Sequence, residues 1–269
     1  CVITLVTNVF ITAIFLLKVK DKRISKNFGW TSFASSTWAI GALFFSLSKT
    51  QSLATFWLKM AHAGIVLTPT FFAYFVIGFT GKKDTIIRVV LPILTGIYLL
   101  CNFFYPHFYG VKLLFNEFYF FSVSFPKNWV YVLLYVCIYW FILLHAFFLL
   151  IRFFVSTAGS LRNQVKYFIL GMIVAWLGPA GMFLPVFGVN VYPWTNILIA
   201  IYPLILAYAI LRYRLMDIRV AFSRTGIFII VYTLVLGVPF YVGYNTQSWV
   251  SSTILAVTFA SVGPLVFRY

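Results

Sequence analysis

The chain has 269 residues, of which 63% are hydrophobic and only 9% are charged. A soluble domain carries about 25% charged residues, so this composition excludes a soluble globule and predicts an integral membrane protein. A net charge of +16 is also typical of nucleic-acid-binding proteins, but here the basic residues separate apolar runs instead of gathering on one polar face. We therefore expect no nucleic-acid partner, and expect the basic residues to lie against anionic lipid headgroups.

The apolar runs are continuous, and most are close to the roughly 20 residues that a membrane-crossing helix needs. The first seven occupy residues 1–17, 28–48, 56–80, 88–105, 129–151, 167–187 and 193–211, and two more occupy 226–244 and 249–267. They are too long for the alternating strands of a membrane barrel. The sequence predicts an all-α polytopic membrane helical bundle of about nine helices. Its expected parts are a seven-helix region, 1–222, whose first helix is truncated, and a two-helix output hairpin, 223–269.

Two connections between these runs are longer than the others. Residues 106–128 are expected to form a loop on the outer side, and Arg152–Lys166 to form a polar connection on the inner side. Short turns are expected at 49–52, 188–192 and 245–248.

The basic residues are distributed unequally between the two sets of alternating connections. Most of the 20 Lys and Arg residues lie on one side, whereas the other side has only Lys49, Lys112 and Lys127 in its connections and Lys59 in the first turns of the third run. Because cytoplasmic loops carry the excess of Lys and Arg, the chain is expected to start outside and to end in the cytoplasm.

Polar side chains inside the apolar runs are the candidates for a ligand-sensing role, because burying them in a membrane is costly. His62 lies one turn deeper than Lys59 in the third run, and Asn102 lies near the outer end of the fourth. We group His62 and Asn102 with Trp38 as candidate sensing residues. The alternative for His62 is a hydrogen-bonded packing role, and Asn102 can bond to a neighbouring helix. A functional role is less favoured for His145.

The sequence offers no pattern that predicts catalysis. The acidic residues are Asp21, Asp84, Glu117 and Asp217, and all four lie in connections. Acid–base chemistry by a carboxylate pair is therefore not expected. Three scattered histidines do not form a zinc-ligand pattern, and no phosphate-binding loop occurs. We expect no catalytic residue, no metal and no cofactor in this chain.

Several prolines interrupt the apolar runs, and each removes a helical hydrogen bond and favours a kink. Those expected to matter most are Pro69, Pro179, Pro203 and Pro239. Such kinks either serve packing alone or bend helices to open a cavity.

A cationic segment, Tyr208–Val220, joins the seventh and eighth runs. It contains Arg212, Arg214, Asp217 and Arg219. One interpretation is an anchor to lipid headgroups. The other is a hinge that relays a change from the bundle to the hairpin after it.

Several stretches together resemble a known family. Residues 27–41 and 57–75 resemble the second and third helices of the bacterial histidine-kinase N-terminal seven-transmembrane region, and 208–218 resembles its exit from the seventh helix. Residues 231–240 and 261–267 look like the extra hairpin that precedes GAF and kinase domains in some members.

The resemblance implies a membrane sensor or anchor region of a two-component sensor histidine kinase, multi-pass in the bacterial inner membrane. It also implies an unknown signal ligand, and a homodimer formed through a kinase region that this chain does not contain. The resemblance implies kinase activity only for the full-length parent, so whether this chain is part of an enzyme stays open. The alternative is a small-solute transporter or channel, which an odd helix count and the lack of buried charge disfavour.

Overall fold

The computed structural model describes residues 2–13, 15–16 and 23–186, and beyond these 189, 191–192, 195, 198–199, 201–202 and 205. They belong to the first of two compact units, Cys1–Met216, and the second unit is Asp217–Tyr269. The predicted output hairpin, the hinge residues Arg212, Arg214, Asp217 and Arg219, and the predicted kinks at Pro203 and Pro239 lie outside the described residues.

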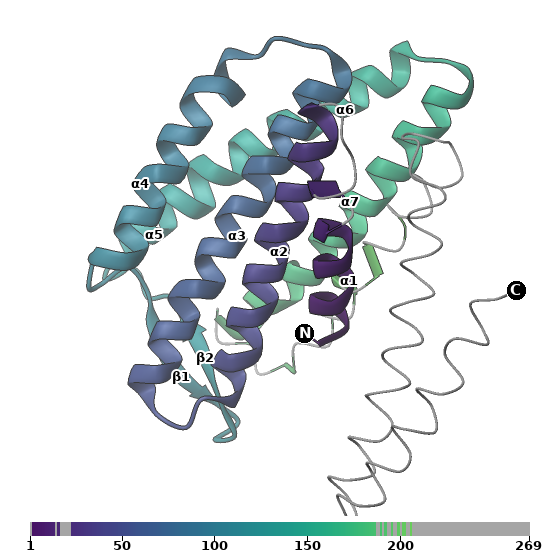
Figure 1. The fold of residues 1–269 in the computed structure, drawn as a ribbon. Coiled ribbons are helices and arrows are strands. Elements are labelled where there is room, and N and C mark those ends of the chain that lie inside the picture. Colours follow the sequence, from purple (N-terminus) through teal and green to yellow (C-terminus); the bar gives the residue numbers. More distant parts are fainter. Residues whose placement is uncertain are drawn as a thin grey trace, which may run out of the picture. The chain divides into compact units, whose positions relative to one another are not determined.

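The described part is a bundle of helices (Figure 1). A short helix, α1 (Val2–Ala13), is followed by α2 (Arg23–Leu47) and α3 (Gln51–Thr80). A π-helical turn, η2 (Ile86–Val90), leads into α4 (Leu91–Phe104). The next span runs without a break through α5 (Trp129–Tyr131), the π-helical η3 (Val132–Tyr139) and α6 (Trp140–Ser156), and α7 (Gly159–Val186) follows.

Within the described residues, four helices are long and apolar enough to cross a membrane: Gln51–Thr80, Ile86–Phe104, Trp129–Ser156 and Leu161–Val186. α2 is long enough, with 25 residues, but it is less apolar. Its polar residues include Thr31, Ser32, Ser35 and Ser36, and all four are buried inside the bundle. Low hydropathy in α2 therefore reflects a hydroxyl-rich face that packs against other helices.

The expectation of a polar connection over Arg152–Lys166 is wrong. α6 continues to Ser156, and α7 begins at Gly159, which has a φ of +62°. Arg162 and Lys166 are exposed on the first turns of α7. The helix therefore extends past its apolar part, with charged side chains turned to the surroundings.

The all-α prediction is also wrong in one place. The expected loop at 106–128 contains an antiparallel hairpin of β1 (Gly110–Leu114) and β2 (Phe118–Ser122), with Val111 opposite Phe121. The aromatic β2 sequence has high β propensity. The chain reverses at Phe115 and Asn116, which both have positive φ, and Glu117 N donates to Leu114 O at 3.1 Å.

α2 and α3 approach each other closely because glycines face the partner helix. A Cβ added at Gly64 would lie 2.7 Å from the carbonyl oxygen of Ala34, and one added at Gly41 would lie 2.7 Å from Ala61 Cα. Both distances are too short for a side-chain carbon. Ala61 and Gly64 therefore lie at a close helix contact, as expected where small residues let membrane helices approach.

The hairpin covers the end of the bundle at which α2 turns into α3 (Figure 1). Its buried residues Leu114, Phe120 and Phe121 form one apolar cluster with residues of α2, α3 and α7, namely Phe45, Ala54, Leu58 and Val186. Lys112 Nζ donates to Pro185 O at 2.6 Å, which ties β1 to the end of α7. The hairpin thus closes one end of the helical interior.

Candidate functional site

A cavity of about 150 Å³ lies between the helices of the bundle. Its wall consists mainly of aromatic and aliphatic side chains from α2, α3, β2, α5 to α7 and the segment near Tyr202. They are Phe28, Thr31, Ser35, Trp38, His62, Ile65, Thr68, Pro69, Phe72, Phe121, Tyr131, Tyr135, Trp140, Leu143, Met172, Ala175, Trp176, Phe183, Ile199 and Tyr202. No Lys, Arg, Asp or Glu is among them, so the wall favours an uncharged occupant.

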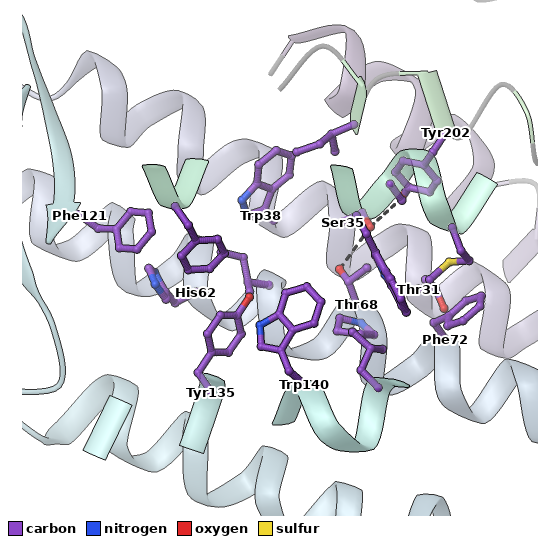
Figure 2. Close-up of a pocket in the computed structure, with 18 of the residues that line it drawn as sticks. Thr31, Ser35, Trp38, His62, Thr68, Phe72, Phe121, Tyr135, Trp140 and Tyr202 are labelled. Atoms are coloured by element: carbon purple, nitrogen blue, oxygen red, sulfur yellow. Dashed lines mark hydrogen bonds between the residues drawn. The ribbon is translucent and has the colours of Figure 1, made fainter. Parts of the chain in front are cut away.

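A chain of hydroxyl groups crosses one part of the cavity wall (Figure 2). Ser35 Oγ lies 3.2 Å from Thr68 Oγ1 and 3.0 Å from Tyr202 Oη. Thr68 Oγ1 donates to Gly64 O at 2.8 Å, and Tyr202 Oη donates to Asn8 Oδ1 at 3.2 Å. Four segments of the chain, α1, α2, α3 and the helical residues 201–202, are therefore connected by polar contacts at the cavity.

His62 lies in another part of the wall, beside Phe121 and Tyr135 in Figure 2, and its side chain is only 1% exposed. Its Nδ1 lies 3.0 Å from Leu58 O, which places the proton on Nδ1. The ring stacks on Tyr109 with centroids 4.4 Å apart and meets Phe121 edge-on at 5.5 Å. Nε2 is left buried without a hydrogen-bond partner in the described part of the chain.

The sensing candidates separate into two places. His62 and Trp38 both line the cavity, whereas Asn102 is not part of its wall. Asn102 instead joins α3, α4 and the start of the hairpin, because its Nδ2 donates to Lys59 O at 2.9 Å and its Oδ1 accepts from Tyr109 Oη at 2.6 Å. The expected bond from Asn102 to a neighbouring helix is confirmed. Burial raises the pKa of Tyr109, so its hydroxyl stays protonated and donates this bond.

Two of the prolines that are predicted to kink helices lie within the described residues. Pro69 lies inside α3 and lines the cavity, and Pro179 lies within the span of α7. A kink at either position stays a prediction.

Several residues of the site were not predicted from the sequence. Tyr131, Trp140 and Trp176 read as ordinary apolar or aromatic positions within their runs, and only the folded arrangement brings them to one cavity. The hydroxyl of Ser35 carried a weak signal, since it stands with other Ser and Thr residues in an otherwise apolar stretch. Tyr202 carried none.

A second polar contact lies at the end of the bundle opposite the β-hairpin. His145 Nε2, on α6, is 2.8 Å from Asp84 Oδ2, in the connection between α3 and η2. Ile87 N also donates to Asp84 Oδ1 at 3.0 Å. Desolvation raises the pKa of Asp84, but the bonds from His145 and from the backbone outweigh it and hold that pKa below its usual value. This pair does not touch the cavity wall.

The arrangement supports binding and packing. Aromatic rings, a hydroxyl chain and one neutral imidazole can hold a small uncharged molecule. None of the described residues that line the cavity carries a carboxylate.

Comparison with known proteins finds a family to which the chain is similar. No curated protein and no solved structure matches the chain. Residues 1–219 match the family model described as the N-terminal 7TM region of histidine kinase, which covers α1 to α7, the β-hairpin and the cavity. The apolar helices of the described part agree with a membrane region of this kind. This chain therefore belongs to the family of N-terminal seven-transmembrane regions of histidine kinases.

Proposed function

We propose that this chain is the membrane sensor region of a bacterial two-component sensor histidine kinase, embedded in the cytoplasmic membrane with its start outside. It passes an external or bilayer signal to a kinase module in the cytoplasm. The observation that carries the proposal is the cavity, because its wall is built from α2, α3, β2, α6 and α7 together. An occupant that binds one packing of these elements better than another shifts the bundle between two states.

The proposed route to the kinase starts at Tyr202. Its hydroxyl is hydrogen-bonded to Ser35 and Asn8, so a change at the cavity alters the hydrogen bonds that hold this segment in place. A few residues later the chain enters the cationic segment with Arg212, Arg214, Asp217 and Arg219. We assign that segment the role of a hinge against anionic headgroups, followed by the output hairpin 223–269.

The parent protein is proposed to act as a homodimer, joined through its kinase region. In that arrangement a packing change in each membrane region reaches the paired kinase modules. The region itself contributes recognition and transmission, and the parent contributes phosphoryl transfer.

Deleting residues 226–267 from the full-length parent tests the route. In liposomes, Trp38→Ala enlarges the cavity and should change the autophosphorylation rate of the intact parent. The same substitution should have no further effect in the deleted parent, because the output hairpin is gone. An equal effect of Trp38→Ala in both proteins would rule out the hairpin as transmitter. Solute flux through the same liposomes, together with unchanged autophosphorylation, would favour the transporter alternative.

A further inference from the structure

The hydroxyl chain in the cavity wall has more acceptors than hydrogens. Thr68 uses its hydrogen on Gly64 O, and Tyr202 uses its hydrogen on Asn8 Oδ1. Asn8 meets this chain through its acceptor Oδ1, while its amide nitrogen donates one hydrogen to Thr4 O at 2.8 Å. Ser35 therefore has one hydrogen between two acceptor oxygens, Thr68 Oγ1 and Tyr202 Oη. One oxygen at the cavity wall can accept a hydrogen bond for which the described residues show no donor.

His62 adds an acceptor of the same kind. Its Nδ1–H is directed to Leu58 O, so Nε2 carries a lone pair and has no partner in the described part of the protein. Thr68 follows His62 by six residues in α3, or about 9 Å along the helix. The spare acceptor capacity of the hydroxyl chain and the lone pair of His62 Nε2 therefore belong to separate parts of the same wall. Both would be stabilised by a donor, and neither by another acceptor.

The rest of the wall selects for size and for a flat apolar body. The cavity volume of about 150 Å³ is comparable to that of engineered cavities that take up benzene. Trp38, Phe72, Trp140 and Trp176 supply ring faces and edges, which attract an aromatic guest beyond simple burial. The absence of a charged side chain from the wall opposes an ion.

We propose that this cavity binds a small, uncharged aromatic molecule that donates one hydrogen bond, as phenol does. The donor group bonds to the free oxygen of the Ser35, Thr68 and Tyr202 chain, and the ring packs among the tryptophans. The inference rests on the proposed function, because it names the ligand class of the same sensing site.

The experiment measures binding of 4-fluorophenol and 4-fluorotoluene to the full-length parent in lipid nanodiscs by fluorine NMR. The two probes differ only in hydroxyl against methyl, and empty nanodiscs correct for partition into lipid. We expect saturable binding of 4-fluorophenol, about ten-fold tighter than that of 4-fluorotoluene, since the latter leaves the acceptor unpaired. Equal affinities, or no saturable binding of either probe, would overturn the proposal.

Thr68→Val provides the sharper test, because it removes one of the two acceptors and keeps nearly the same shape. The single hydrogen of Ser35 then has only Tyr202 Oη to satisfy. The preference for 4-fluorophenol should fall to about parity while 4-fluorotoluene still binds, and this retained binding shows that the variant is folded. Ser46→Ala is the matched control, since Ser46 is on α2 outside the cavity and bonds to Ala42 O. An unchanged preference in Thr68→Val would contradict the proposal.

Autophosphorylation in the same nanodiscs separates this inference from the proposed function. Selective 4-fluorophenol binding without any change in autophosphorylation supports the ligand class and contradicts the sensor role. A kinase response to cavity substitutions in a protein that binds neither probe contradicts the ligand class and leaves the sensor role standing.

Discussion

Gly64 sets how closely α3 approaches α2. The position is buried against the backbone of Ala34 and Trp38, so no side-chain carbon fits there without moving one helix. Trp38 lines the cavity on the same stretch of α2. Gly64, together with Gly41, therefore sets the spacing of the two helices beside the cavity.

Gly64→Ala should destabilise the protein by about 1–3 kcal/mol, because the added methyl overpacks the contact. The measurement is the thermal unfolding midpoint in detergent. Gly96→Ala is the control, since a Cβ at Gly96 meets nothing within 4 Å. It should raise stability by about 0.5–1 kcal/mol through lower chain entropy in the unfolded state. Similar midpoints for both variants would argue against the close α2–α3 contact.

Single residues were partly predictable from the sequence. A histidine and a tryptophan within apolar runs stand out, and His62 and Trp38 do line the cavity. Asn102 stood out by the same reasoning, yet it joins α3, α4 and Tyr109 away from the cavity wall. Because it is costly to bury a polar group without a partner, a polar residue within an apolar run is expected to form a hydrogen bond. Which residue is its partner depends on which helices are its neighbours. That information is absent from a single run.

At the scale of elements, the β-hairpin acts as a cover for the cavity. Phe121 of β2 reaches the cavity wall, while Lys112 of β1 holds the end of α7 through Pro185 O. The sequence predicted a loop here because each strand is far shorter than a membrane span. Strand pairing depends on contacts with other elements, which local composition does not reveal.

Lys112→Met should loosen this cover by removing a charged donor that is worth about 1.5–3 kcal/mol. We expect faster hydrogen exchange in residues 110–122, measured by mass spectrometry in nanodiscs. Lys127→Met, an exposed lysine in the same connection, should leave that exchange unchanged. Equal exchange in the two variants would show that the bond to Pro185 does not hold the hairpin.

The Asp84–His145 pair connects the α3–η2 turn to α6 at the other end. The pKa of Asp84 is lower in the folded protein than its ordinary value of 3.8, so the carboxylate stabilises the fold above that value. The contribution disappears as the pH falls through the folded pKa. Because both side chains are partly exposed, it amounts to about 1 kcal/mol at most.

Asp84→Asn should therefore lower the thermal midpoint at about pH 7, and the loss should be smaller at about pH 3, because the contribution of the carboxylate declines as the pH falls below 3.8. Glu117→Gln, at an exposed acid in the hairpin turn, should change neither midpoint. A loss that is larger at the acidic pH would mean that the assigned sign is wrong.

At the scale of the whole molecule, charge predicts the orientation. Exposed Lys127 lies in the connection that holds the hairpin, and exposed Lys83 in the one that follows α3. In spheroplasts of a parent without its native cysteines, a membrane-impermeant maleimide should label Lys127→Cys directly. Lys83→Cys should be labelled only after permeabilisation, as the excess of Lys and Arg on the cytoplasmic side requires. The reverse labelling pattern would invert the proposed topology.

The central claim is that packing at the cavity sets the output of the parent kinase. Ala175→Phe fills the cavity from α7, whereas Leu177→Phe adds bulk on the exposed face of the same helix, where the side chain is 54% exposed. The most direct measurement is the initial autophosphorylation rate of the full-length parent in liposomes. Ala175→Phe should change this rate by about three-fold or more, a shift of only about 0.65 kcal/mol between two states, and Leu177→Phe should leave it unchanged. An unaltered rate in Ala175→Phe would contradict the claim.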